Sequence, residues 1–150
     1  MKLASYFAVS GIVGILFGLG FLLLPEVSLR QYGIPAEPHN AMQSRYFGSV
    51  LLAYGLVPWL GRNLRDDAAL RVVLSSGVVA HAIGAALSIW AVTTGWQNQM
   101  AWGSVVIYAV LLAGSLYYLR QQLEELSRPS ESLIEVASPT REPDCEPSGA

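Results

Sequence analysis

Charged side chains are scarce in this chain of 150 residues, where they make up 13% of the sequence. Soluble domains typically carry about 25%. Residues 72–93 contain no Asp, Glu, Lys or Arg at all. This shortage argues against an ordinary soluble domain and favours a chain embedded in the lipid bilayer. The net charge of -2 gives no reason to expect a nucleic-acid partner.

Cysteine and histidine are almost missing too, with only Cys145, His39 and His81 present. A single cysteine excludes a disulfide framework and a CxxC redox pair. No second histidine or carboxylate lies at the depth of His81, so we expect neither a metal site nor haem ligation. Phosphate-loop, HExxH and GxSxG motifs are absent as well. We therefore assign no catalytic residue and no cofactor, and we do not expect an enzyme.

The sequence has four long apolar runs, at residues 3–24, 41–60, 72–93 and 100–119. About 20 residues of helix cross the roughly 30 Å hydrocarbon layer. A signal peptide is the alternative for the first run, but its apolar core would be too long and no small-residue cleavage site follows. We predict an all-α integral membrane four-helix bundle with up-down-up-down topology over residues 1–120. Residues 121–150 are acidic and contain four prolines, which predicts a disordered cytoplasmic tail.

The basic residues predict an orientation for this bundle. Only Arg30, and Arg45 just inside the membrane, belong to one side. The other side holds Lys2, Arg62, Arg65, Arg71, Arg120, Arg128 and Arg141. The positive-inside rule places both termini in the cytoplasm. We expect the chain in the bacterial cytoplasmic (inner) membrane, with the lipid bilayer as its first partner.

Small residues recur at helical spacing in three of the runs and predict close helix packing. One row is Ser10, Gly14 and Gly18. In the second run, Gly48 and Gly55 lie on the helix face that also holds Arg45, Leu52 and Trp59. In the third run, Gly77 and Ala85 lie in one row with His81. The adjacent row consists of Ala80, Gly84 and Ser88.

His81 lies near the middle of the third run and is the first candidate site residue. An imidazole in a membrane can bind a ligand or relay a proton. The alternative is a structural histidine, hydrogen-bonded across helices to Tyr54, Tyr108 or Ser104. Both interpretations place Tyr54 and Tyr108 near it.

Arg45 is the second candidate, about one helical turn below the membrane boundary. It can snorkel to the headgroups, bind an anion or lipid headgroup, or pair with Glu26 at the end of the first run. A pair would form the floor of a polar pocket together with Gln97 and Asn98. The ligand-binding candidates are thus His81, Arg45, Tyr54, Tyr108 and Glu26.

Several segments also carry a resemblance. They are LLLPEVSLRQYGIP after the first run, SRYFGSVLLAYGLVPWL in the second, the histidine of the third, and GWQNQMAWGSV at the turn into the fourth. With these segments the chain resembles small bacterial four-helix membrane proteins of unknown function that are loosely DoxX-like. The resemblance covers residues 3–119. It implies the architecture and no activity.

Three functional hypotheses remain open. The first is an accessory or interaction subunit whose small-residue faces bind another membrane protein or a second copy of the chain. The second is a binder or carrier of an apolar small molecule, such as a lipid or a quinone, at a midplane site near His81. The third is a membrane redox subunit. A cavity beside His81 would favour the second.

Overall fold

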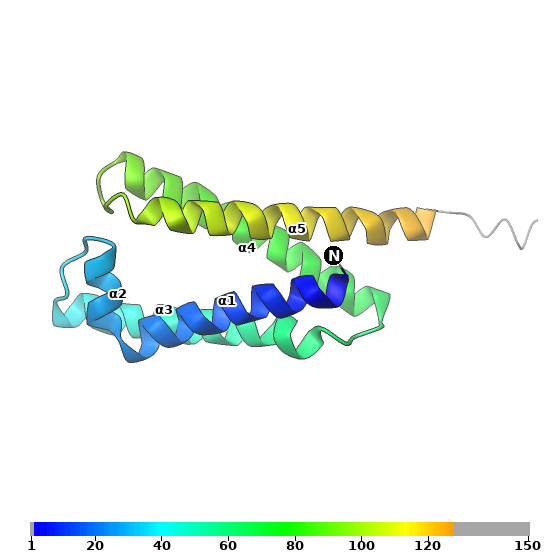
Figure 1. The fold of residues 1–150 in the computed structure, drawn as a ribbon, viewed down its shortest axis with the longest axis horizontal. Coiled ribbons are helices and arrows are strands. Elements are labelled where there is room, and N and C mark those ends of the chain that lie inside the picture. Colours follow the sequence, from blue (N-terminus) through cyan, green and yellow to red (C-terminus); the bar gives the residue numbers. More distant parts are fainter. Residues whose placement is uncertain (1, 128–150) are drawn as a thin grey trace, which may run out of the picture.

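The computed structural model describes residues 2–127, and within that range the chain is helical and contains no strand (Figure 1). The all-α prediction is therefore confirmed. The elements are α1 (Leu3–Leu23), α2 (Pro25–Gln31), α3 (Pro38–Gly61), α4 (Asp67–Thr93) and α5 (Ala101–Ser127). The predicted disordered tail lies outside the described residues from residue 128 onward.

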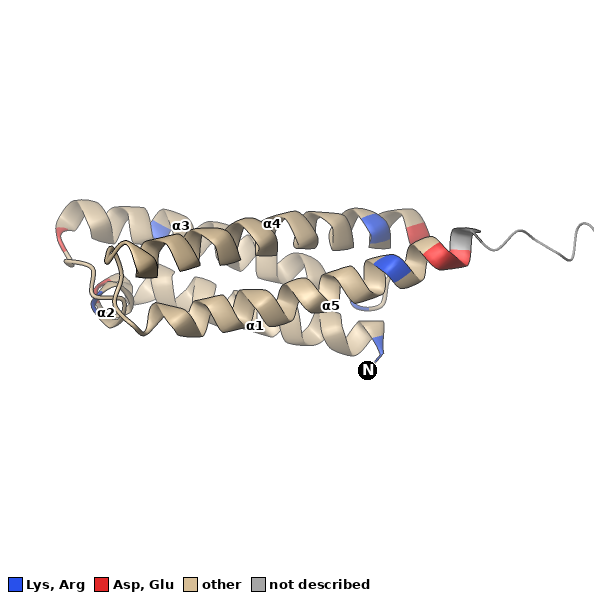
Figure 2. Ribbon diagram, turned by 90° about the horizontal axis from the view of Figure 1, so that it is seen from above, with Lys and Arg blue, Asp and Glu red and all other residues tan. Residues whose placement is uncertain are grey.

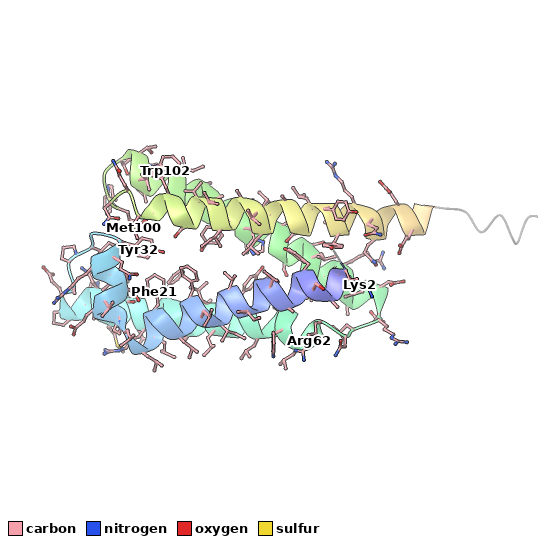
Figure 3. All side chains as sticks on the ribbon, in the orientation of Figure 1. Lys2, Phe21, Tyr32, Arg62, Met100 and Trp102 are labelled. Atoms are coloured by element: carbon pink, nitrogen blue, oxygen red, sulfur yellow. The ribbon has the colours of Figure 1, made fainter. Side chains whose placement is uncertain are left out.

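The four long helices are arranged as two antiparallel pairs, α1 with α3 and α4 with α5 (Figure 1). Helices of different pairs make far fewer contacts with each other than helices of the same pair. The pairs lie closest near the end marked by Lys2 and Arg62 and separate toward the end marked by Tyr32 and Met100 (Figure 3). The short helix α2 lies at the wider end.

Three of these helices, α1, α4 and α5, are long and apolar enough to cross a membrane. Charged residues gather toward the two ends of the molecule and leave a long uncharged middle (Figure 2). The chain is therefore a membrane-embedded protein. The fourth long helix, α3, is less apolar because Asn40, Gln43 and Arg45 occupy its first turns.

The observed helix ends differ from the predicted ones where polar residues extend an apolar run. Helix α4 begins at Asp67 because Asp66 caps it, with Oδ1 accepting from the amide of Ala69 at 2.6 Å. Helix α3 begins at Pro38, and α5 continues beyond residue 119 to Ser127.

Helix α2 was not expected, because it lies between the first two predicted apolar runs. Pro25 occupies the first turn, where its missing N–H is no loss and its fixed φ suits a helix. Glu26 adds a negative charge near the positive end of the helix dipole. Leu29 is buried, which holds the segment against the bundle.

The segment around α2 connects the two helix pairs at the wider end. The hydroxyl of Tyr32 lies 2.9 Å from Ser104 Oγ on α5. Asn98, in the turn between α4 and α5, donates from its side chain to the carbonyl of Gln31 at 2.8 Å. The amide of Asn98 also donates to the carbonyl of Tyr32 at 3.0 Å. These bonds close that end of the molecule.

Helices α1 and α3 are in direct backbone contact, as the small-residue rows predict. A Cβ added to Gly18 would lie 2.5 Å from the amide nitrogen of Leu52, and one added to Gly14 would lie 2.7 Å from the Cα of Gly55. On the other side, a Cβ on Gly48 would lie 2.5 Å from the amide nitrogen of Leu22. No side chain fits between the two helices at these points.

We predict that Gly18→Ala destabilises the protein by about 1–3 kcal/mol, because the methyl group must push α3 away from α1. Gly20→Ala is the matched control, since a Cβ there meets only Ser28 Oγ at 3.8 Å. That change should be neutral or stabilise by up to about 1 kcal/mol through helix propensity. Thermal unfolding in detergent measures both. Equal effects of the two substitutions would contradict the backbone contact.

Candidate functional site

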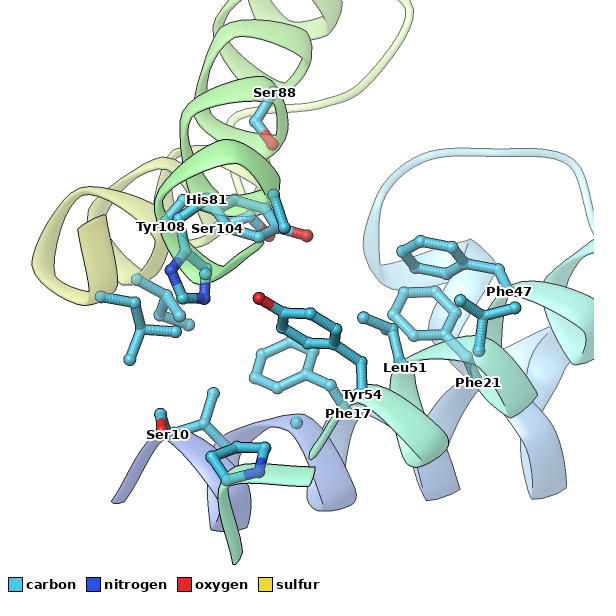
Figure 4. A pocket seen from close by; sticks show the side chains of 18 of the residues that line it. Ser10, Phe17, Phe21, Phe47, Leu51, Tyr54, His81, Ser88, Ser104 and Tyr108 are labelled. Carbon is cyan, nitrogen blue, oxygen red and sulfur yellow. The ribbon is translucent and has the colours of Figure 1, made fainter. Parts of the chain in front are cut away.

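A cavity of about 650 Å³ lies between the two helix pairs (Figure 4). Side chains of all five helices line it, together with residues of the two loops that meet at the wider end. None of the lining residues is an Asp, Glu, Lys or Arg. The cavity is therefore uncharged, and most of its wall is apolar.

Aromatic side chains form much of the wall on the α1–α3 side. Phe17, Phe21 and Phe47 all line the cavity (Figure 4). The rings of Phe21 and Phe47 meet edge to face with centroids 5.3 Å apart, and Phe21 also stacks on Tyr32 at 5.9 Å. Such rings offer a large apolar surface with little conformational freedom to lose.

His81 enters the cavity from α4 and is 6% exposed. Its Nδ1 lies 3.3 Å from Ser115 Oγ on α5. Gly77, one turn before His81, leaves room for this contact, because a Cβ there would lie 3.0 Å from the same Ser115 oxygen. The histidine is thus fixed between α4 and α5.

The contact at His81 continues to α1 through Ser115. The hydroxyl of Tyr6 lies 2.6 Å from Ser115 Oγ and also donates to the carbonyl of Leu111 at 2.8 Å. Tyr6 and Ser115 are both buried. One connected set of hydrogen bonds therefore joins α4, α5 and α1 on the side of the cavity nearer the Lys2 end.

Tyr54 and Tyr108 flank His81 from α3 and α5. The Tyr54 ring meets the imidazole edge to face with centroids 6.1 Å apart, and the Tyr108 centroid lies at 6.4 Å. Figure 4 shows the Tyr54 hydroxyl pointing toward the His81 ring across open space. Gly84 makes room for Tyr108, since a Cβ there would lie 2.7 Å from its ring.

The predicted neighbourhood of His81 is present, but its hydrogen-bond partner is a different residue. We expected Tyr54, Tyr108 or Ser104, and the structure places Ser115 there. The two tyrosines contact His81 through their rings only. Ser104 bonds to Tyr32 at the wider end of the cavity.

Ser115 and Tyr6 are the residues that the sequence analysis missed. Tyr6 lies four residues after Lys2, and Ser115 lies five residues before Arg120, at the same end of antiparallel helices. Counting depth from the basic residues puts both at about the same level. This count could have shown that Tyr6 and Ser115 lie at the same depth. It does not show in which direction their side chains point.

Arg45 and Glu26 do not belong to this site. Both side chains are exposed, neither lines the cavity, and no ion pair joins them in the described part of the chain. Arg45 follows Ser44, which is buried and donates to the carbonyl of Phe21 at 3.2 Å. Gln97 does line the cavity, whereas Asn98 is bonded to α2. The expected pocket of these polar residues is not assembled.

Among residues 2–127, no three His, Cys, Asp or Glu side chains come together in a group that could hold a metal ion. Comparison of the chain with protein-family models, curated proteins and solved structures finds no match. The resemblance to DoxX-like proteins stays a prediction.

We predict that Tyr6→Phe and Ser115→Ala each destabilise the protein by about 1–3 kcal/mol, because each leaves a buried polar group without its partner. In the double variant the losses should fall short of their sum, since both changes break the same bond. Ser76→Ala is the control, because its hydroxyl is exposed and bonds only to Val73 of its own helix. Chemical unfolding in detergent supplies the free energies. Strictly additive losses would show that the two hydroxyls are not coupled.

Proposed function

We propose that all four long helices cross the bilayer as an up-down-up-down bundle, with α3 as the fourth membrane helix. The support for α3 is its backbone contact with α1, which extends from Leu22 against Gly48 to Gly11 against Trp59. A helix held that closely along most of α1 must share its depth. Lys2 and Arg62 lie at one end (Figure 3), and the positive-inside rule makes that end cytoplasmic in a bacterial inner membrane.

This orientation predicts that Cys145, the single cysteine, is labelled by a membrane-impermeant maleimide only in inside-out vesicles. A Cys145→Ser/Gln99→Cys variant moves the thiol to the α4–α5 turn, where Gln99 is exposed. That thiol should react only in right-side-out vesicles. Mass spectrometry of the labelled chain measures both. Labelling of both positions from the same side would refute the four-span topology.

We infer that the protein binds a neutral, amphipathic small molecule of the lipid phase in the cavity between its helix pairs. The observation that carries this proposal is the 650 Å³ space with His81, Tyr54 and Tyr108 at its wall. Ligand sites are typically apolar spaces of roughly 300–1,000 Å³ with a few convergent polar groups. This cavity has that size and that composition.

The uncharged lining indicates that the ligand is neutral. A charge buried without a partner costs several kcal/mol, and no lining residue carries a charge that could compensate it. A phosphate or ammonium headgroup is therefore a poor occupant, whereas an uncharged lipid or a quinone suits the chemistry of the wall.

Access from the bilayer is available between α3 and α4. The backbones of these helices hardly approach each other, although the Tyr54 ring meets His81. Phe47, Val50 and Val57 line the cavity and are 46%, 66% and 51% exposed. This apolar edge lets a molecule enter sideways from the lipid and leave its tail there.

Binding by the small-residue faces, on which the accessory-subunit hypothesis relied, has less support. Gly14 and Gly18 pack on α3, and Gly84 packs on Tyr108. These faces are occupied within the chain. Interaction with another membrane protein or a second copy, and a role as a redox subunit, remain predictions that no contact described above favours.

We predict that native mass spectrometry of protein released from lipid nanodiscs detects a discrete bound molecule. Ala80 lines the cavity, and Ala80→Phe should lower occupancy at least about tenfold by filling the space. Ala82→Phe, two residues away, is the control, because Ala82 is exposed and does not line the cavity. It should retain the molecule.

A protein with no bound molecule, or equal occupancy in the two phenylalanine variants, would contradict binding in the cavity. A protein partner that binds in stoichiometric amount to both the wild type and Ala80→Phe would favour the accessory hypothesis instead.

A further inference from the structure

We propose that the ligand's polar group is a hydroxyl, an alcohol or a phenol, that donates its proton to Nε2 of His81. This inference rests on the proposed binding function and specifies the chemistry of the same cavity. Three observations carry it: the direction of the hydrogen bonds behind His81, the unpaired second nitrogen, and the two tyrosine hydroxyls beside it.

The direction of the hydrogen bonds follows from the carbonyl of Leu111, which can only accept. Because Tyr6 has a single hydroxyl proton and donates it to this carbonyl, it must accept from Ser115. Ser115 has then used its own proton, so it accepts from His81, whose Nδ1 carries the hydrogen. The hydrogen-bond network thus assigns the tautomer.

A neutral imidazole protonated at Nδ1 has its lone pair on Nε2. Among residues 2–127, Nε2 has no hydrogen-bond partner, although His81 is only 6% exposed. In the described residues, no fully covered side-chain nitrogen or oxygen lacks a partner. Nε2 therefore has open surface, and His81 lines the cavity.

The bonds behind His81 position it without relaying a proton. A relay needs a group at its far end that can accept a proton and pass it on, and a helix carbonyl such as that of Leu111 does not. Tyr6 and Ser115 are thus positioning residues, which orient the ring and keep Nε2 as an acceptor. In the opposite arrangement, Tyr6 would donate to Ser115 and Ser115 would donate to Nδ1 of His81. The hydroxyl oxygen of Tyr6 and the carbonyl oxygen of Leu111 would then lie 2.8 Å apart with no hydrogen between them.

Because of the two tyrosines, the site suits a ligand hydroxyl better than a ligand group that can only accept a hydrogen bond. The hydroxyls of Tyr54 and Tyr108 can each donate or accept. A ketone, ester or ether would be bonded by a tyrosine but would leave Nε2 bare. A ligand hydroxyl donates to Nε2 and accepts from a tyrosine, which satisfies the buried acceptor.

The experiment compares two probes, para-octylphenol and its methyl ether para-octylanisole, which differ in the donated proton. Each is titrated into the full-length protein in lipid nanodiscs, with empty nanodiscs as the partitioning control, and occupancy is read by native mass spectrometry. Wild type should bind the phenol about tenfold more tightly than the ether, the effect of one hydrogen bond to a buried acceptor.

Variants assign this preference to His81. In His81→Leu the preference should fall to about twofold or less while the ether still binds, because the apolar wall is unchanged. In Ser115→Ala, His81 remains but its tautomer is no longer fixed. The preference for the phenol over the ether should then be about a third of the wild-type preference. This second variant keeps the test available if His81→Leu does not fold. Ser49→Ala should keep the full preference, because Ser49 is exposed, bonds to Tyr46 of its own helix and does not line the cavity.

The outcomes separate the two proposals. If neither probe binds wild type, the proposed binding function itself is wrong. If both bind wild type equally, the cavity binds ligands but the hydroxyl inference is overturned. A phenol preference that persists in His81→Leu would also overturn it, since another group would then accept the proton.

Discussion

The direct backbone contact between α1 and α3 is the constraint on which the rest of the molecule depends. Gly18 against Leu52 and Gly48 against Leu22 bring the two helices together until no side chain fits between them. The small residues are used up in this contact. Some larger side chains of these helices, among them Phe17, line the space between the pairs (Figure 4), whereas others such as Leu16 and Leu60 are exposed. Packing is thus tight within this pair and looser between the pairs.

The second pair is attached to the first at two places, and the cavity lies between them. At one place Tyr6 bonds to Ser115 and its ring packs on Tyr118 with centroids 5.3 Å apart. At the other, Tyr32 bonds to Ser104 and Asn98 to the end of α2. At the first place the buried side chains of Phe7 and Leu74 also pack together, so apolar packing and hydrogen bonds both join the pairs, as is usual for helices in lipid.

The sequence predicts features that depend on the spacing of residues and on their depth in the membrane. It does not predict the direction in which a side chain points around its helix. Apolar length located the helices, and four-residue spacing found Gly14 and Gly18 in the contact with α3. Depth alone brought Tyr54 and Tyr108 near His81 but could not identify Ser115, because a shift of one residue turns a side chain by about 100°. The same limit applies to Arg45, whose neighbour Ser44 is the buried one. Pro25 can end one helix or begin another, so α2 could not be predicted.

The cavity of about 650 Å³ is partly open and most of its wall is apolar, so hydrocarbon chains of the bilayer can fill it. Lipid tails would fill the volume but leave Nε2 of His81 unsatisfied. A molecule that brings a hydroxyl to His81 forms this hydrogen bond, which a lipid tail cannot form. The hydrogen bond to one buried nitrogen can therefore favour this molecule over the surrounding lipid chains.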